Sequence, residues 1–165
     1  QRRTIIMAEE NKEFTITEDD KINFFKCFLS DTSYSEEMVL FDGQFKLKFK
    51  TMTTKETTDV FDQLRQSQIN SELTNDPNYI VTLTNYRLGL SLEEIDGKPF
   101  APEITADKYK PADENDSYVK AKASVFKTWP IFKLSAIADA FKKFEHKVVA
   151  LTDAIQTENF WKAAK

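Results

Sequence analysis

"LFDGQFKLKFK", residues 40–50, carries the clearest strand pattern of this chain. Asp42-Gly43 is a turn signal, and the residues after it alternate between apolar and basic side chains. Because successive side chains of a strand point to opposite faces, this period of two places the aromatic residues on one face and the lysines on the other. The stretch therefore predicts a β-hairpin at about residues 36–51.

The lysine row Lys46, Lys48 and Lys50 has two interpretations. It could bind an acidic partner, or it could be the solvated side of a sheet. A phosphate-binding face would favour arginines, with aromatic residues interleaved on the same face. Here the aromatic residues lie on the opposite face, and outward charges also protect an edge strand from unwanted pairing. We therefore favour the solvated side of a sheet.

Helices are predicted on both sides of the hairpin. Thr17 and the acidic residues after it predict a helix over about 18–29, since negative charge stabilises a helix N-terminus. Thr53 and Glu56 have the spacing of a capping box, which predicts a second helix that ends near Gln68 or Ser71. The spacing of apolar residues between Ile131 and Ile155 predicts a long amphipathic helix.

Three further segments remain to be assigned. Residues 77–93 contain strand formers but no turn signal, and their length favours a buried helix over a strand. The segment 95–100 reads as a tight turn between short extended arms. A helix is predicted after residue 117, and Pro130 should break it because the residue before a proline avoids helical torsions.

These elements predict an α+β fold that is mainly helical, in which one hairpin packs with several helices. We expect a flexible N-terminus at 1–13, a core domain at 14–100, a linker or arm at 101–118 and a C-terminal helical region at 119–165. Residues 1–6 precede Met7 and are assigned no function.

The composition argues against several functional classes. Only 3 glycines are present, which leaves little material for a glycine-rich phosphate loop. A formal net charge of −4 makes nucleic-acid binding improbable. The single Cys27 has no partner for a disulfide and no CxxC context for a metal. No run of 18 apolar residues is present, so no membrane span is expected.

Catalytic and metal sites are not predicted either. His146 is the one histidine, and among its charged neighbours it reads as a solvated surface residue. Triads that depend on an imidazole therefore have no obvious base. The paired acids stand mostly at helix starts or in loops, where solvation and the helix dipole explain them. We expect a protein that is not an enzyme, with no catalytic residue, cofactor or metal.

The candidate functional surface is apolar. Phe160-Trp161 near the end of the chain could close the core or anchor a partner, as aromatic residues often do at interfaces. We predict that a partner binds the apolar face of the last helix together with this pair. The predicted residues are Ile137, Phe141, Phe144, Val148, Leu151, Phe160 and Trp161.

Four segments of the chain form a familiar combination: "EFTITEDDKINFFKCFLSD", "MVLFDGQFKLKFKTMTTKETTDVFDQL", "NYIVTLTNYRLGLSLEEIDGKPF" and "FEHKVVALTDAIQTENFWK". Together they resemble tail assembly chaperones of tailed bacteriophages. The resemblance covers most of residues 12–165, and none of its motifs is catalytic.

The resemblance implies a non-enzymatic viral protein of virion morphogenesis. Chaperones of this type bind the long tape-measure protein and recruit tail-tube subunits around it, in the bacterial host cytoplasm. Homo-oligomerisation stays open. The alternative is a structural virion component of the tail, baseplate or neck.

Overall fold

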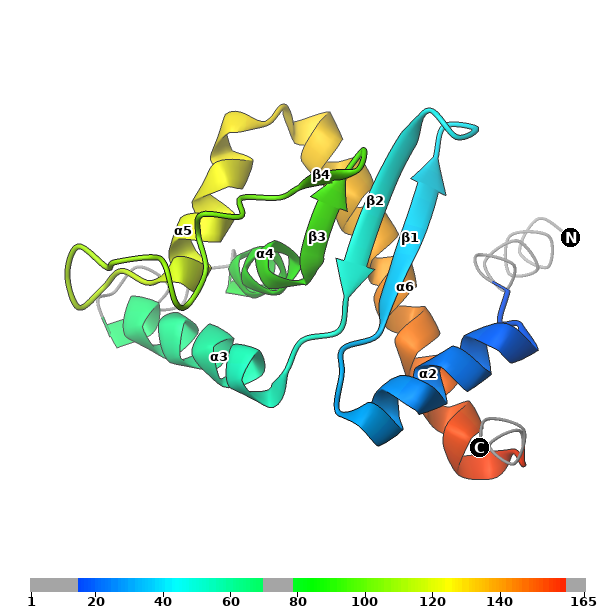
Figure 1. The fold of residues 1–165 in the computed structure, drawn as a ribbon. Helices are drawn as coiled ribbons and strands as arrows, with labels where there is room; N and C mark the ends of the chain where they lie inside the picture. Colours follow the sequence, from blue (N-terminus) through cyan, green and yellow to red (C-terminus); the bar gives the residue numbers. More distant parts are fainter. Residues whose placement is uncertain (1–14, 70–78, 160–165) are drawn as a thin grey trace, which may run out of the picture. The chain divides into compact units, whose positions relative to one another are not determined.

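The computed structural model describes residues 15–69 and 79–159, and the chain forms five helices and a four-stranded antiparallel sheet within them (Figure 1). The predicted α+β, mainly helical fold is confirmed. The elements are α2 (Glu18–Ser30), β1 (Ser35–Leu40), β2 (Phe45–Lys50), α3 (Thr54–Ile69), α4 (Tyr79–Ser91), β3 (Leu92–Ile95), β4 (Lys98–Pro99), α5 (Tyr118–Val125), the 3-10 turn η1 (Phe126–Thr128) and α6 (Ile131–Thr157).

The chain divides into two compact units. One unit contains the residues up to Tyr34 and those from Asp139 onward, and the other contains Ser35–Ala138. The boundary falls inside α6, so this division differs from the predicted one, which placed boundaries around residues 101–118.

The second unit contains the whole sheet, in the order β1-β2-β3-β4. The predicted hairpin is confirmed, with Leu40 opposite Phe45 at its closed end. A second hairpin joins β3 to β4 through Asp96-Gly97, both at positive φ, as the turn signal in 95–100 predicted. The lysine strand β2 is not an edge strand, because β3 pairs with its other side.

Alternation along β2 separates a buried face from a polar one. Leu47 and Phe49 are fully buried, whereas Lys46 is exposed and the other two lysines are half-buried. The bulge between Lys48 and Phe49, where the pairing to β3 changes register, leaves this alternation intact.

Helices α3, α4 and α5 of the same unit pack on one another (Figure 1). Their shared core is a cluster of Val60, Leu64, Tyr86, Leu90 and Val119. Gly89 lets α4 and α5 approach closely, because a Cβ at this position would lie 3.3 Å from Lys122 Cβ. Within its described part, the ambiguous segment 77–93 is helix from Tyr79 to Ser91, and this helix passes directly into β3. Helix α5, predicted in a separate C-terminal region, belongs to this packed layer.

Aromatic side chains pack against one another where the chain passes from α5 to α6. The ring centroids of Phe126 and Trp129 are 4.9 Å apart, and Phe100 lies 5.6 Å from Phe126. The Lys133 ammonium group sits 4.6 Å from the centroid of the Trp129 ring. The predicted helix break at Pro130 is confirmed.

Residues 101–117 contain neither helix nor strand, but hydrogen bonds hold this segment in place. Gln63 and Gln66 of α3 both donate side-chain hydrogen bonds to Asn115. Tyr109 Oη donates to Asp116 Oδ2 at 2.6 Å, which closes the segment on itself. The segment expected as a linker or arm is thus a folded loop anchored to α3.

The first unit is built from α2 and the part of α6 after Ala138. Thr17 and Asp20 form a complete capping box at the start of α2. Tyr34 is buried, with its ring stacked on Phe144 and edge-on to Phe24. The buried Lys147 lies 3.1 Å from Asp20 Oδ2 and links α6 to α2.

Candidate functional site

The predicted partner-binding face of α6 lies mostly inside the protein. Four of its side chains are buried and Val148 is half-buried; the buried ones are Ile137, Phe141, Phe144 and Leu151. In this conformation those side chains offer little surface to a partner, and their binding role stays a prediction. Phe160 and Trp161 lie outside the described residues.

The exposed apolar surface lies elsewhere, most clearly at the hairpin tip, which we define as residues 39–45. Phe41 is 67% exposed and stands in the turn between β1 and β2. Its ring centroid is 6.5 Å from that of Phe45, and its carbonyl accepts a 3.1 Å hydrogen bond from the Gln44 N–H. Val39, on the lysine face opposite Lys46, is 51% exposed.

The backbone of this tip is unusual. Phe41 and Asp42 have φ values of 54° and 53°, and Gly43 has a φ of 86°. Glycine adopts such torsions freely, but the left-handed region costs an aromatic residue roughly 1–2 kcal/mol. Phe41 therefore combines backbone strain with an exposed ring, and strain of this kind tends to gather at functional positions.

The sequence did carry a signal for Phe41 that the prediction missed. Turns favour small and polar residues, and here a phenylalanine stands directly before Asp42-Gly43. A large aromatic side chain in a turn is therefore a hint of a contact made outside the hairpin.

A second exposed apolar pair begins α6. Ile131 and Phe132 are each 76% exposed. The helical spacing placed Ile131 in the same stripe as Ile137, but only the later residues of that stripe are covered.

The lysine row is largely neutralised by carboxylates. Lys50 Nζ lies 2.8 Å from Glu56 on α3, and Lys48 Nζ lies 3.8 Å from Glu93 on β3. Lys122 of α5 joins them around a cavity of about 380 Å³, which Glu93 and Glu94 also line. Burial, with a smaller contribution from Lys50, lowers the pKa of Lys122. The mixed charge fits the predicted solvated face better than an anion site.

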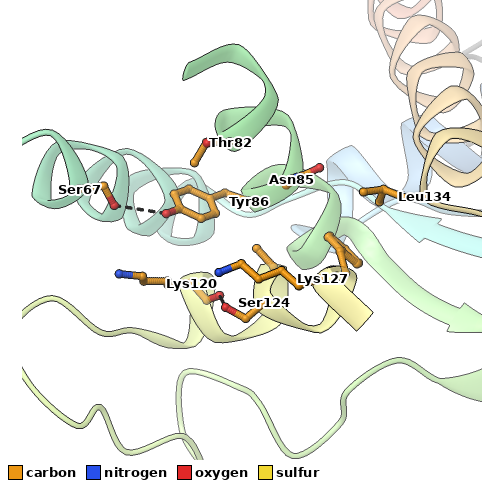
Figure 2. A pocket seen from close by; sticks show the side chains of 10 residues that line it. Ser67, Thr82, Asn85, Tyr86, Lys120, Ser124, Lys127 and Leu134 are labelled. Carbon is orange, nitrogen blue, oxygen red and sulfur yellow. Dashed lines mark hydrogen bonds between the residues drawn. The ribbon is translucent and has the colours of Figure 1, made fainter. Parts of the chain in front are cut away.

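A different cavity, of about 280 Å³, lies among the helices of the second unit (Figure 2). Its walls come from α3, α4, α5, η1 and the start of α6. The lining residues are Ser67, Thr82, Asn85, Tyr86, Lys120, Ala123, Ser124, Phe126, Lys127 and Leu134. None of them is acidic, which distinguishes this cavity from the one beside the lysine row.

Other sites were sought within residues 15–69 and 79–159. No group of three or more histidine, cysteine, aspartate or glutamate side chains there could hold a metal ion. His146 is exposed on α6. No helix in these ranges combines the length and the apolar character that crossing a membrane requires.

Comparison with known proteins adds no relative. No protein-family description, no curated protein and no solved structure matches this chain.

Proposed function

We propose that this chain is a non-enzymatic binding protein of phage tail assembly, and that it covers apolar surface of a partner while the tail is built. The observation that carries the binding role is Phe41, which is 67% exposed and held at a φ of 54°. The sequence resemblance supplies the rest of the proposal: a chaperone of the tape-measure or tail-tube proteins, acting in the host cytoplasm.

The hairpin tip is well suited to anchor such a partner. Its turn is closed by the backbone hydrogen bond from Gln44 to Phe41, so the ring is presented by a structured loop. A preorganised aromatic side chain loses little conformational freedom on binding. Full burial of a phenylalanine contributes roughly 1.5–3 kcal/mol, which is the scale of an interface hot spot.

The test of the binding surface uses the strain at Phe41 to separate binding from folding. Asparagine tolerates the left-handed region well, so Phe41→Asn should leave stability equal or higher. The same variant should lose at least about tenfold in affinity for the partner, equivalent to roughly 1.4 kcal/mol. Phe61→Asn is the matched control, because Phe61 is also exposed in this unit but lies on α3.

The partner is sought by pull-down from infected-cell lysate, beside mass spectrometry of purified mature particles. Capture of the tape-measure protein or of tail-tube subunits by the wild type, with loss in Phe41→Asn and absence from the particle, supports the chaperone proposal. Many copies per particle would make the chain a structural component of the tail, baseplate or neck. Equal capture by Phe41→Asn and wild type would remove the hairpin tip from the interface.

A further inference from the structure

We propose that the cavity in Figure 2 binds a small phosphate monoester, a function separate from partner binding at the hairpin tip. At about 280 Å³ its volume is near the lower end of the range of small-molecule sites. It can therefore admit a phosphate group with a compact organic substituent.

The charge of the lining favours an anion. Lys120 of α5 and Lys127 of η1 lie together on one side of the cavity, and none of the described residues that line it is a carboxylate (Figure 2). The chain as a whole has a net charge of −4, so a described lining with two lysines and no acid differs from the average composition. Asp116, which precedes α5 in the chain, lies outside the lining and accepts hydrogen bonds from Tyr109 and the Ala112 N–H.

The buried wall of the cavity offers a hydrogen that lacks an acceptor. Ser67 and Tyr86 are 2% and 5% exposed, and their hydroxyl oxygens lie 3.3 Å apart. Ser67 Oγ also accepts a hydrogen bond from Gln63 Nε2. Whichever hydroxyl donates to the other, one O–H hydrogen has no acceptor among the residues that the structure describes. An unsatisfied buried donor is unfavourable, so a bound acceptor would be stabilised here.

Other lining groups add to the supply of donors. The Thr82 hydroxyl, the Asn85 amide and the Lys127 ammonium group make no hydrogen bond or ion pair to the described part of the chain. A phosphate dianion presents several strong acceptor oxygens and requires no donor of its own. Phe126 and Leu134 form an apolar wall that an organic substituent would contact.

Binding is measured by calorimetry on the full chain, with phenyl phosphate as the probe. Inorganic phosphate and sodium chloride are titrated at matched ionic strength. Lys127→Gln removes an exposed charge outside the core and should weaken binding about tenfold, the equivalent of roughly 1.4 kcal/mol. Lys98→Gln makes the same charge change on β4, away from the cavity, and should bind like the wild type.

Tyr86→Phe tests the buried donor, and its unfolding curve shows whether the fold is kept. A folded Tyr86→Phe that binds several-fold more weakly supports the hydroxyl contact. Preference for phenyl phosphate supports a monoester ligand, and equal affinity for inorganic phosphate would overturn that part in favour of free phosphate. No saturable binding beyond chloride, or equal losses in Lys127→Gln and Lys98→Gln, would overturn the site. None of these outcomes bears on capture of a tail protein by the hairpin tip.

Discussion

Helices α3, α4 and α5 of one compact unit and helix α2 of the other are held by different kinds of contact. In Ser35–Ala138, helices α3, α4 and α5 share an apolar cluster, and β2 carries fully buried side chains. In the other unit, α2 has no buried residue, and its contacts with α6 include the ion pair between Asp20 and Lys147. Apolar burial depends little on pH or salt, whereas charge pairs depend on both. These two regions should therefore respond differently to the same perturbation.

The largest expected effect tests the apolar side of this comparison. Phe49 on β2 is fully buried, so Phe49→Ala removes its packing and leaves a cavity. We expect a loss of about 3–5 kcal/mol in the free energy of unfolding, measured in urea. Phe28→Ala on α2, where the ring is 64% exposed, should lose much less. Similar losses in the two variants would contradict the difference between the two regions.

The next largest effect is expected at the ion pair of α2. Burial raises the pKa of Asp20, but the hydrogen bonds from the Thr17 N–H and from Lys147 outweigh it and hold this pKa below 3.8. The stability that Asp20 contributes is therefore complete above its ordinary pKa and is lost as the pH falls through the lowered value. We expect Asp20→Asn to lose about 2 kcal/mol at neutral pH and to flatten the acid side of the stability profile.

Asp19→Asn is the matched control for this prediction. Asp19 is the neighbouring residue, is exposed, and makes the same charge change in the first turn of α2. It should leave the acid profile close to that of the wild type. An equal effect at Asp19 would assign the stabilisation to the helix dipole and not to the pairing of Asp20.

A half-buried tyrosine in the second unit gives the opposite pH dependence. Burial and the hydrogen bond that Tyr118 Oη donates to Asp59 raise the pKa of Tyr118 above 10.0. This stability is present below the ordinary pKa and is lost as the pH rises through the raised value. Tyr118→Phe should lose about 1–2 kcal/mol at neutral pH and flatten the alkaline loss, followed by urea unfolding at several pH values. Tyr109→Phe should have a smaller effect, because Tyr109 donates to Asp116 within the loop, whereas Tyr118 also packs against the apolar cluster.

The smallest effect uses one motif that both units contain. Thr17 caps α2 and Thr53 caps α3, each in a reciprocal hydrogen-bond pair with an acid three residues later. Thr17→Ala and Thr53→Ala should each lose about 1 kcal/mol. Because the contact is local, the two losses should agree in thermal or urea unfolding. A clear inequality would show that the units differ even in how they depend on helix ends.

Local sequence was sufficient to predict most of the individual helices, strands and turns. The Asp42-Gly43 turn with its period-two flank predicted the first hairpin, and Thr53 with Glu56 predicted the start of α3. Pro130 predicted the break before α6. These signals work because turn torsions, caps and proline sterics act within a few residues of the chain.

Tertiary structure alone decided the position of β2 and the accessibility of α6. β2 is an interior strand because β3, more than forty residues later, pairs with it, and no local pattern on β2 records that neighbour. The apolar spacing of α6 is continuous, yet Ile131 is exposed and Ile137 is buried. Periodicity identifies an apolar stripe but does not show which part of it another segment covers.

The candidate sites also combine features that local sequence predicts with features that only tertiary structure decides. Phe41 was visible in the sequence as an aromatic residue in a turn, but its positive φ and its exposure are properties of the folded hairpin. The phosphate cavity joins Ser67 of α3 to Lys127 of η1 and Leu134 of α6, residues distant in sequence. By itself the sequence determined which short segments become helix, strand or turn, because those choices depend on neighbouring residues. Which side chains meet, and which stay exposed, depended on long-range packing.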